Sequence, residues 1–364
     1  MIGEIFRDSG RSLESLPRRG KFTLSAAEVV LPTELKKVPR LFLTAALLLM
    51  VGAVVSVFGI TLWPVSRDSL SDGLNFEALD PDLGAIQQAQ EATYRARDGA
   101  DIFYRQFGDS SNDYLVLIHG SGSEGRYLAS LANAISRDDL ATAIVPDLRG
   151  HGRSPAAIGD IDYLGQYEDD LDDLIAHLRR RSPNANIVLA GHSSGGGLVI
   201  RWAGGDTSES VQAYLLLAPY LGRDSPTVRP QSGGWVQVSV RRYIGLGILN
   251  GFGIDWLNGL PVLFFNRPDE WNDEFQAESY SFRLNESLAP RAGLADLTRM
   301  SQPALVVVGA DDESFYAEEF VEVFGQFDAT ATVEVVPDAM HLNLPDSSAA
   351  RSTIFAWLAD VYAR

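Results

Sequence analysis

Over the C-terminal three quarters of the chain, short apolar runs alternate with longer amphipathic stretches. Five of these runs are continuously apolar, as is typical of strands buried on both faces. They are residues 114–118, 143–145, 187–189, 213–217 and 305–308. Between two of them, residues 163–181 place apolar side chains near helical spacing, with acidic residues early and three arginines at the end. The pattern predicts an α/β fold with a mostly parallel central sheet and helices on both faces.

Residues 41–65 contain no charged side chain. At about 1.5 Å per residue, this stretch is long enough to cross a hydrocarbon core of about 30 Å. A cleaved signal peptide is the alternative, but the leader of 40 residues is long, and the apolar region of such peptides is usually only about 7 to 15 residues. The sequence therefore predicts one transmembrane helix over residues 41–65, through which the protein contacts a membrane.

The charges on the two sides of this stretch differ. Lys36, Lys37 and Arg40 precede it, whereas mainly acidic residues follow it. Because an excess of Lys and Arg favours the cytoplasmic side, we expect residues 1–40 to be cytoplasmic. The protein would then be a single-pass membrane protein whose catalytic domain lies outside the cytoplasm, with Trp63 at the membrane interface.

The rest of the chain divides by composition. Residues 66–92 are acidic and rich in Asp, Ser, Gly and Gln, which predicts a linker, and compact structure is expected to begin near Tyr94. The α/β core is predicted over residues 93–220 and 299–364. Residues 221–298 interrupt the alternation and are rich in aromatic residues, Gly and Pro, so we interpret them as a helical cap insert over the catalytic mouth.

Composition excludes several functions. The chain of 364 residues has a net charge of −18, although residues 1–40 are net positive, and such an acidic body argues against nucleic acid as a partner. The absence of cysteine excludes disulfides, thiolate nucleophiles and cysteine-based metal sites. The acidic run between residues 168 and 173 fits a solvated helix face better than a metal site.

The pentapeptide at residues 191–195, Gly-His-Ser-Ser-Gly, lies between a buried-strand pattern and a helix pattern. In a G-x-S-x-G sequence, the tight turn between strand and helix lifts the serine hydroxyl into an active site. Ser193 is therefore the candidate nucleophile. His192 is expected to pack away from it, because neighbouring side chains on a sharp turn diverge.

A serine nucleophile needs a base and an acid that orients the base. Of the five histidines, only His341 follows a late strand, residues 332–336, on the loop before the last helix. The candidate acids follow the strand at 305–308, at the end where ligands gather in such sheets. We favour Asp312, with Asp311 or Glu313 as helix-capping alternatives. This gives the chain order serine, acid, histidine that the fold uses.

The developing oxyanion needs backbone donors. The expected donors are the N–H of Ser194, which follows the nucleophile, and one N–H from the loop after the first central strand. In that loop, His119-Gly120-Ser121-Gly122, the N–H of Ser121 is the predicted donor, with Gly122 as the alternative.

The same loop offers a competing pattern. Gly120, Gly122 and Gly125 follow a strand with dinucleotide-binding spacing, and Asp147 ends the next strand. This interpretation leaves the serine, acid and base without a role. The dinucleotide interpretation also requires the strand before these glycines to be the first strand of the domain. Residues 101–107 already form an earlier strand pattern.

With these residues assembled, the segment from about Tyr94 to Arg364 resembles the α/β-hydrolase superfamily, and most of all its monoacylglycerol lipase and lysophospholipase branch. The resemblance rests on His119-Gly120-Ser121-Gly122 with Gly125-Arg126-Tyr127, on Asp147-Leu148-Arg149-Gly150-His151-Gly152-Arg153-Ser154, on residues 191–195, on Gly309-Ala310-Asp311-Asp312 and on His341. Haloalkane dehalogenases and epoxide hydrolases differ, since they have an aspartate in place of Ser193. The membrane segment departs from the usual soluble lipase of the branch.

The resemblance implies a serine hydrolase that cleaves carboxylic esters through an acyl-enzyme, with no cofactor and no metal. Together with the predicted transmembrane helix, this gives a membrane-anchored enzyme. The aromatic cap and the anchor favour a hydrophobic or lipid acyl ester over another small-molecule ester. Small-ester, amide or C–C bond hydrolysis by the same triad are alternatives. A non-catalytic, membrane-tethered binding protein is the alternative of a different class. The sequence does not indicate an oligomeric state.

Overall fold

The computed structural model describes residues 40–65, 73–79, 83–109, 112–205, 211–327 and 330–364. The predicted cytoplasmic segment 1–40 therefore lies outside the described residues, except for Arg40. The chain divides into two compact units, Met1–Val54 and Val55–Arg364. The second unit contains the last two turns of helix α1 and the whole folded domain.

The centre of the folded domain is an eight-stranded sheet in the order β1-β2-β4-β3-β5-β6-β10-β11. Its strands are β1 Gln90–Arg95, β2 Asp101–Phe107, β3 Asp113–Ile118, β4 Thr142–Pro146, β5 Asn186–His192, β6 Ala213–Leu217, β10 Ala304–Gly309 and β11 Ala331–Val336. The pairs β1–β2 and β2–β4 are antiparallel, and the pairs from β4 to β11 are parallel. The predicted mostly parallel sheet is confirmed.

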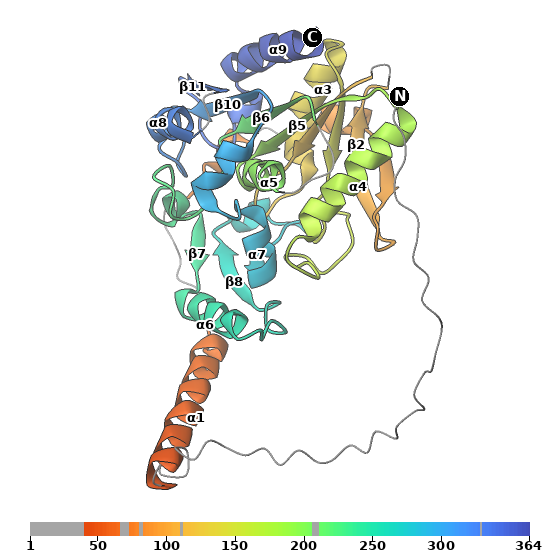
Figure 1. The fold of residues 1–364 in the computed structure, drawn as a ribbon. Helices are drawn as coiled ribbons and strands as arrows, with labels where there is room; N and C mark the ends of the chain where they lie inside the picture. The colour runs from red at the N-terminus through yellow and green to blue at the C-terminus, as the bar shows by residue number, and fades with distance from the viewer. Residues whose placement is uncertain (1–39, 66–72, 80–82, 110–111, 206–210, 328–329) are drawn as a thin grey trace, which may run out of the picture. The chain divides into compact units, whose positions relative to one another are not determined.

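Helices cover this sheet on both faces (Figure 1). The main ones are α3 Ala129–Arg137, α4 Gln166–Arg181, α5 Ser194–Ala203, α8 Ala317–Phe327 and α9 Ser348–Tyr362. Helix α3 connects β3 to β4, and α4 connects β4 to β5 on the other side of β3, so the two connections run in opposite directions across the sheet. Because both crossovers are right-handed, α3 and α4 lie on opposite faces. A hydrogen bond of 2.7 Å from Arg351 to Ser130 joins α9 to α3, and one of 2.8 Å from Trp202 to Asp172 joins α5 to α4.

The described part of the predicted linker is not a simple connector. It contains the 3-10 helix η2 Phe76–Ala78 and helix α2 Leu83–Gln88, and the sheet already begins at Gln90. Phe76 is buried, with its ring centroid 5.4 Å from that of Trp235. The acidic composition of residues 66–92 concealed a few apolar side chains that pack onto the folded domain.

The predicted cap insert, residues 221–298, contains helices α6 Val240–Gly251 and α7 Phe282–Leu288. It also contains a three-stranded antiparallel sheet, which the sequence did not predict, formed by β7 Val236–Val238, β8 Pro261–Phe265 and β9 Ser279–Ser281. Two of these strands have only three residues. The third strand alternates in burial, but its sequence is a continuous apolar run. The sequence therefore lacked both the length and the alternation of apolar and polar residues that are expected of half-buried strands.

Helix α1, Arg40–Leu62, coincides with most of the predicted membrane segment. Its stretch Phe42–Leu62 has a mean hydropathy of 2.5 and is long and apolar enough to cross a membrane. Large apolar side chains along it, such as Phe42, Leu48 and Leu49, are exposed.

Candidate active site

Ser193 occupies the turn between β5 and α5 with φ 55° and ψ −121°, in the left-handed half of the map that non-glycine residues rarely adopt. The flanking glycines make this turn possible, because the chain passes very close to itself. A Cβ at Gly191 would lie 2.4 Å from the carbonyl carbon of Gly195, and a Cβ at Gly195 would lie 2.5 Å from the His119 oxygen. The sequence Gly-x-Ser-x-Gly thus folds locally into a strained turn that fixes the serine.

His341 follows β11 on the loop before α9, and its ring is held by Asp312 at the end of β10. His341 Nδ1 donates a hydrogen bond of 2.8 Å to Asp312 Oδ2. The other carboxylate oxygen of Asp312 accepts from the backbone N–H groups of Ser314 and Phe315, at 2.8 and 2.9 Å. Because Nδ1 carries the proton, Nε2 is left as an acceptor.

The three acids at the end of β10 have different contacts. Only Asp312 contacts the His341 ring and is itself buried. The carboxylate of Glu313 accepts from the backbone N–H of His341 at 2.9 Å and from that of Asn75 at 3.1 Å. Asp311 is exposed to solvent. Asp312 is therefore the acid that the geometry places on the imidazole.

The environment of His341 changes its proton affinity. Burial makes the largest contribution and acts to lower the pKa of His341, but the charge and hydrogen bond of Asp312 and the charge of Glu313 act to raise it. The net result is a pKa above the ordinary value of 6.5. The imidazolium form is thus stabilised by the neighbouring carboxylates.

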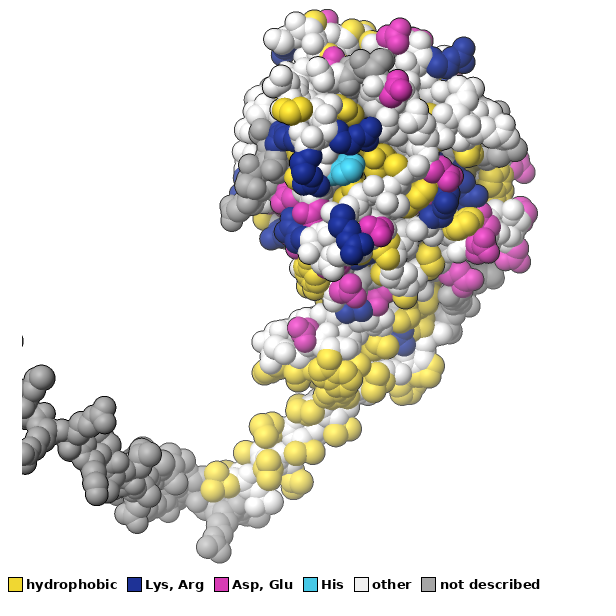
Figure 2. Space-filling model, turned by 90° about the vertical axis from the view of Figure 1, so that its right-hand side faces the viewer, with side chains coloured by type: hydrophobic (Ala, Val, Ile, Leu, Met, Phe, Trp, Pro, Cys, Tyr) yellow, Lys and Arg dark blue, Asp and Glu magenta, His cyan; other side chains and the backbone are white. Residues whose placement is uncertain are grey.

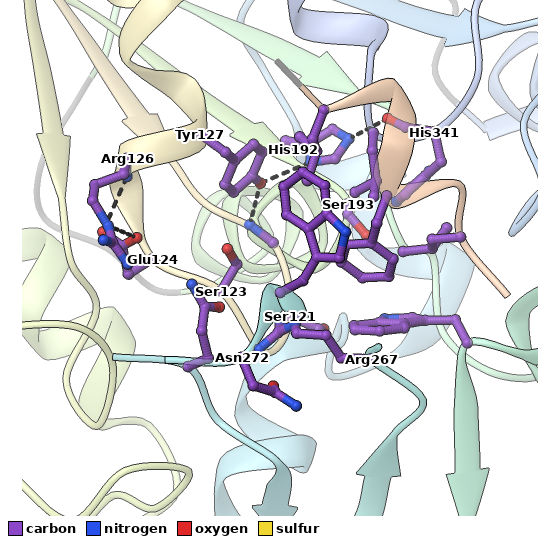
Figure 3. Close-up of a pocket in the computed structure, with 18 of the residues that line it drawn as sticks. Ser121, Ser123, Glu124, Arg126, Tyr127, His192, Ser193, Arg267, Asn272 and His341 are labelled. Carbon is purple, nitrogen blue, oxygen red and sulfur yellow. Dashed lines mark hydrogen bonds and ion pairs between the residues drawn. The ribbon is translucent and has the colours of Figure 1, made fainter. Parts of the chain in front are cut away.

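Ser193 and His341 line one cavity of about 420 Å³, together with Ser121 (Figure 3). Many of its other lining residues are apolar and come from the segment after α1 and from the insert. They are Leu74, Phe76, Leu79, Ile86, Trp235 and Trp271, and a further apolar lining residue, Leu342, follows His341. No hydrogen bond is described between Ser193 Oγ and the His341 ring.

The loop after β3 has two of its N–H groups occupied. Gly120 N–H donates to Tyr127 Oη at 2.7 Å, and Gly122 N–H donates to Tyr280 Oη at 2.6 Å. No partner is described for the N–H of Ser121, which lies between them and lines the cavity. The alternative donor, Gly122, is therefore engaged elsewhere. Ser194, the other predicted donor, opens α5, where backbone N–H groups have no partner within the helix.

A hydrogen-bonded chain that the sequence did not reveal joins this loop to the histidine loop. Tyr127 Oη accepts from Gly120 and donates to His192 Nδ1 at 2.8 Å, and His192 Nε2 donates to the His341 carbonyl oxygen at 3.1 Å (Figure 3). His192 is buried, as expected, and burial holds its pKa well below the usual value. A neutral His192 therefore fixes the backbone of His341 relative to the loop.

Comparisons with known proteins agree with this architecture. The family model described as "Serine aminopeptidase, S33" matches residues 109–259. A non-heme haloperoxidase from Rhodococcus erythropolis is 35% identical over 259 residues, which cover 68% of this chain and 91% of that protein. The chain belongs to the α/β-hydrolase superfamily.

Two further relatives fit this assignment. Lipase LipV from Mycobacterium tuberculosis is 32% identical over 130 residues, 35% of this α/β hydrolase and 46% of the lipase, so the chain spans about half the length of that relative. The crystal structure of a monoacylglycerol lipase from Paleococcus ferrophilus superposes with a TM-score of 0.51 at 21% identity, over 71% of this chain and 99% of that one. The structural likeness shows a shared fold.

In this α/β hydrolase, Asp147 has a structural environment rather than that of a ribose-binding acid. It is fully buried, and its carboxylate accepts from Arg105 at 2.6 Å and from the backbone N–H groups of Gly125 and Arg153, both at 3.0 Å. These contacts occupy the oxygens that a ribose would need. The dinucleotide pattern is thus explained by a buried ion pair that holds the segment after β3 against β2.

The insert holds the same loop from the other side. The carbonyl oxygen of Gly122 accepts from Arg267 Nη2 at 2.7 Å and from the Ala277 N–H at 3.0 Å, while Tyr280 accepts from its N–H. Burial lowers the pKa of Arg267 to about 10. Tyr280 and Arg267 are functional candidates that lie far from the motifs in sequence, so no local pattern could have identified them.

Among the residues that the structure describes, no group of three or more His, Asp or Glu side chains could hold a metal ion. The acidic run in α4 is instead paired with arginines. Asp170 pairs with Arg149 at 2.7 Å and Asp169 with Arg97 at 2.5 Å. The prediction of a solvated helix face is therefore wrong for part of the run, because Glu168 and Asp170 are buried in ion pairs with Arg201 and Arg149.

Proposed function

We propose that this protein is a membrane-anchored serine hydrolase that cleaves carboxylic esters through Ser193, His341 and Asp312. The observation that carries the proposal is that a serine on a strained strand–helix turn and a histidine oriented by a buried aspartate line one cavity. Such an arrangement supplies a nucleophile, a base for its proton and a group that keeps the base in the correct tautomer.

In the proposed mechanism, His341 Nε2 takes the proton of Ser193 Oγ as the oxygen attacks the acyl carbonyl. The N–H groups of Ser121 and Ser194 bind the negative oxygen that forms, and Asp312 stabilises the imidazolium. The imidazolium then gives its proton to the departing alcohol, leaving an acyl-enzyme. Water, deprotonated by His341, attacks this ester, and Ser193 is regenerated as the acid is released.

The apolar lining of the cavity supports a hydrophobic acyl chain as substrate. Leucine, phenylalanine and tryptophan side chains line the cavity that contains Ser193. Burial of an acyl chain contributes about 0.8 kcal/mol for each methylene. The names of the lipase and monoacylglycerol lipase relatives point to the same class. We therefore propose lipid-like or other hydrophobic acyl esters ahead of short esters, amides or C–C bonds.

We also propose that residues 41–65 anchor the enzyme as a single-pass membrane protein. The length and hydropathy of α1 support the anchor, and the basic residues before it support a cytoplasmic N-terminus with the catalytic domain on the other side. Small-molecule or lipid esters and the membrane are thus the proposed partners, with no cofactor.

A fluorophosphonate probe and a panel of esters with graded acyl length test the proposal. We expect the probe to label the folded protein at Ser193, as located by peptide mapping, and kcat/KM to rise with acyl length. An unlabelled folded protein would refute the serine-hydrolase assignment. A preference for acetyl esters, or for an aminoacyl amide included in the panel, would instead refute the hydrophobic ester as the substrate.

The Glu313→Gln variant tests the electrostatics of the base. The proposed base must be neutral, so activity should fall as the pH drops through the pKa of His341, which lies above 6.5. Glu313 helps to raise this pKa. Neutralising Glu313 should lower the pKa of His341 and move the acid limb of the kcat/KM profile to lower pH. The glutamine oxygen can still accept a hydrogen bond from the backbone N–H of His341.

The matched control for this measurement is Glu318→Gln, an exposed acid at the start of α8. Its acid limb should coincide with that of the wild type. An acid limb of Glu313→Gln that stays in place or moves to higher pH would contradict the assignment of His341 as the group that titrates.

A further inference from the structure

Helix α6 of the insert has apolar side chains on two faces. Leu246 and Leu249 are buried on one face, where Leu246 joins a small cluster with Val262 and Phe282. On another face, apolar residues recur every four positions and are exposed: Val240 (60%), Ile244 (52%) and Ile248 (39%). A helix that covers a soluble domain ordinarily turns polar residues to water on its outer face. The outer face of α6 therefore requires another apolar environment.

This exposed surface continues beyond the helix. Phe252 and Trp256 follow α6 and are 80% and 71% exposed. We refer to the five side chains Val240, Ile244, Ile248, Phe252 and Trp256 as the α6 patch. Figure 2 shows hydrophobic side chains gathered at the end of the folded domain from which α1 leaves. Contiguous apolar surfaces of this kind mark a protein or membrane interface.

The last turns of α1 pack directly against α6. Thr61 is fully buried, and a Cβ added to Gly245 would lie only 2.1 Å from Thr61 Oγ1, so this contact requires a glycine. The rings of Phe58 and Trp256 lie 6.5 Å apart. The α6 patch is thus continuous with the apolar surface of the last two turns of α1, which belong to the same compact unit.

Two arginines at the start of α6 lie against the end of α1. Arg242 donates to the carbonyl oxygens of Thr61 at 3.1 Å and Trp63 at 3.3 Å, and the Arg241 guanidinium lies 5.9 Å from the Trp63 ring. Residues 240–254 contain no acidic residue, and Asp255 is exposed beside Trp256. Arginine and tryptophan at the end of an apolar helix are typical of the headgroup region of a bilayer.

We propose that the α6 patch lies in the surface of the bilayer that α1 crosses, with Phe252 and Trp256 inserted at the boundary of headgroups and acyl chains. The proposal rests on the membrane anchor proposed above. A lipid surface explains the patch better than a second copy of the chain does, because the patch continues the apolar surface of the last turns of α1 and two arginines lie beside Trp63 at their end. Interfacial helices bury their apolar face about 5–10 Å into this boundary.

The absence of cysteine in the chain allows single labels to be placed without background. Full-length variants Ile248→Cys, Phe252→Cys, Leu48→Cys and Val321→Cys would each carry an environment-sensitive fluorophore, with one protein molecule in each lipid nanodisc. Leu48 tests the anchor, and the exposed Val321 on α8 is the control. We expect spin-labelled acyl chains to quench the labels at positions 48, 248 and 252, and to leave the label at 321 unquenched.

The outcomes separate this proposal from the anchor. Quenching at position 48 without quenching at 248 and 252 would overturn the interfacial patch and leave the anchor standing. Absence of quenching at all four positions would overturn both. The labels at positions 248 and 252 could also be protected from quenching by aqueous iodide only when each disc holds two protein molecules. This result would show that a second copy covers the patch, and it would also overturn the proposal.

A functional measurement complements the labels. The double variant Ile248→Glu, Phe252→Glu should hydrolyse a long-chain ester embedded in vesicles several-fold more slowly than the wild type, because carboxylates resist insertion. Its activity on a short, water-soluble ester should be unchanged, as should both activities of Val321→Glu. Equal loss on both substrates would show that the patch serves folding rather than the lipid surface.

Discussion

Ser193→Ala should lower kcat/KM for the preferred ester by about 10⁴- to 10⁶-fold, with the protein still folded. The substitution removes the only atom that can form the proposed acyl-enzyme, while the N–H groups of Ser121 and Ser194 and the cavity remain. Alanine keeps the Cβ and adds no larger side chain, so it should fit the strained turn between β5 and α5. The residual rate is expected to come from binding and oxyanion stabilisation alone.

Ester hydrolysis under initial-rate conditions measures this loss, and fluorophosphonate labelling should disappear in parallel. The matched control is Ser182→Ala, at the far end of α4, whose hydroxyl contacts Tyr114 at 2.9 Å and lies outside the cavity lining. Circular dichroism and the melting temperature would verify that both variants fold. Retention of wild-type activity in Ser193→Ala would remove Ser193 as the nucleophile.

Asp312→Asn should reduce kcat/KM by about 10⁴-fold. The carboxylate accepts a hydrogen bond from the protonated Nδ1 of His341. An asparagine amide can instead donate a hydrogen bond to Nδ1, which favours the tautomer with the proton on Nε2. That tautomer cannot take the proton of Ser193. The substitution also removes a negative charge that helps to raise the pKa of His341, so the imidazolium formed during the reaction is less stable.

Kinetics of this variant are best compared with those of Asp311→Asn, because the neighbouring aspartate is exposed and does not contact the ring. We expect Asp311→Asn to retain the wild-type rate within a factor of about two, as surface substitutions usually have small effects. If Asp311→Asn lost activity and Asp312→Asn kept it, the assignment of the acid would be reversed.

The sequence predicted the parts of the structure that depend on local patterns. The parallel strands are continuous apolar runs because they are buried on both faces, so β3, β5, β6 and β10 were visible from hydropathy alone. Ser193 and Asp312 follow two of these strands, β5 and β10, and His341 follows the edge strand β11. Parallel strands bring these ends to one edge of the sheet, so the site could be predicted before its distances were known.

The remaining features arise from contacts between distant parts of the chain. Gly122 and Tyr280, whose hydrogen bond engages the alternative oxyanion donor, are 158 residues apart. The hydrogen bonds that join Tyr127 to His192 and His192 to His341 connect residues 65 and 149 positions apart in the sequence. No periodicity or motif encodes such pairs, and the short strands of the insert were also too brief to produce a signal.

The packing of the segment after α1 bears on how a soluble form of the protein can be made. Leu74, Phe76 and Leu79 form part of the cavity wall, and the backbone N–H of Asn75 donates to Glu313 beside His341. A truncation just before Tyr94, where the composition suggests a domain boundary, would retain every proposed catalytic residue and remove one wall of the substrate site. A cut that separates the folded domain from the proposed anchor therefore belongs before Gly73.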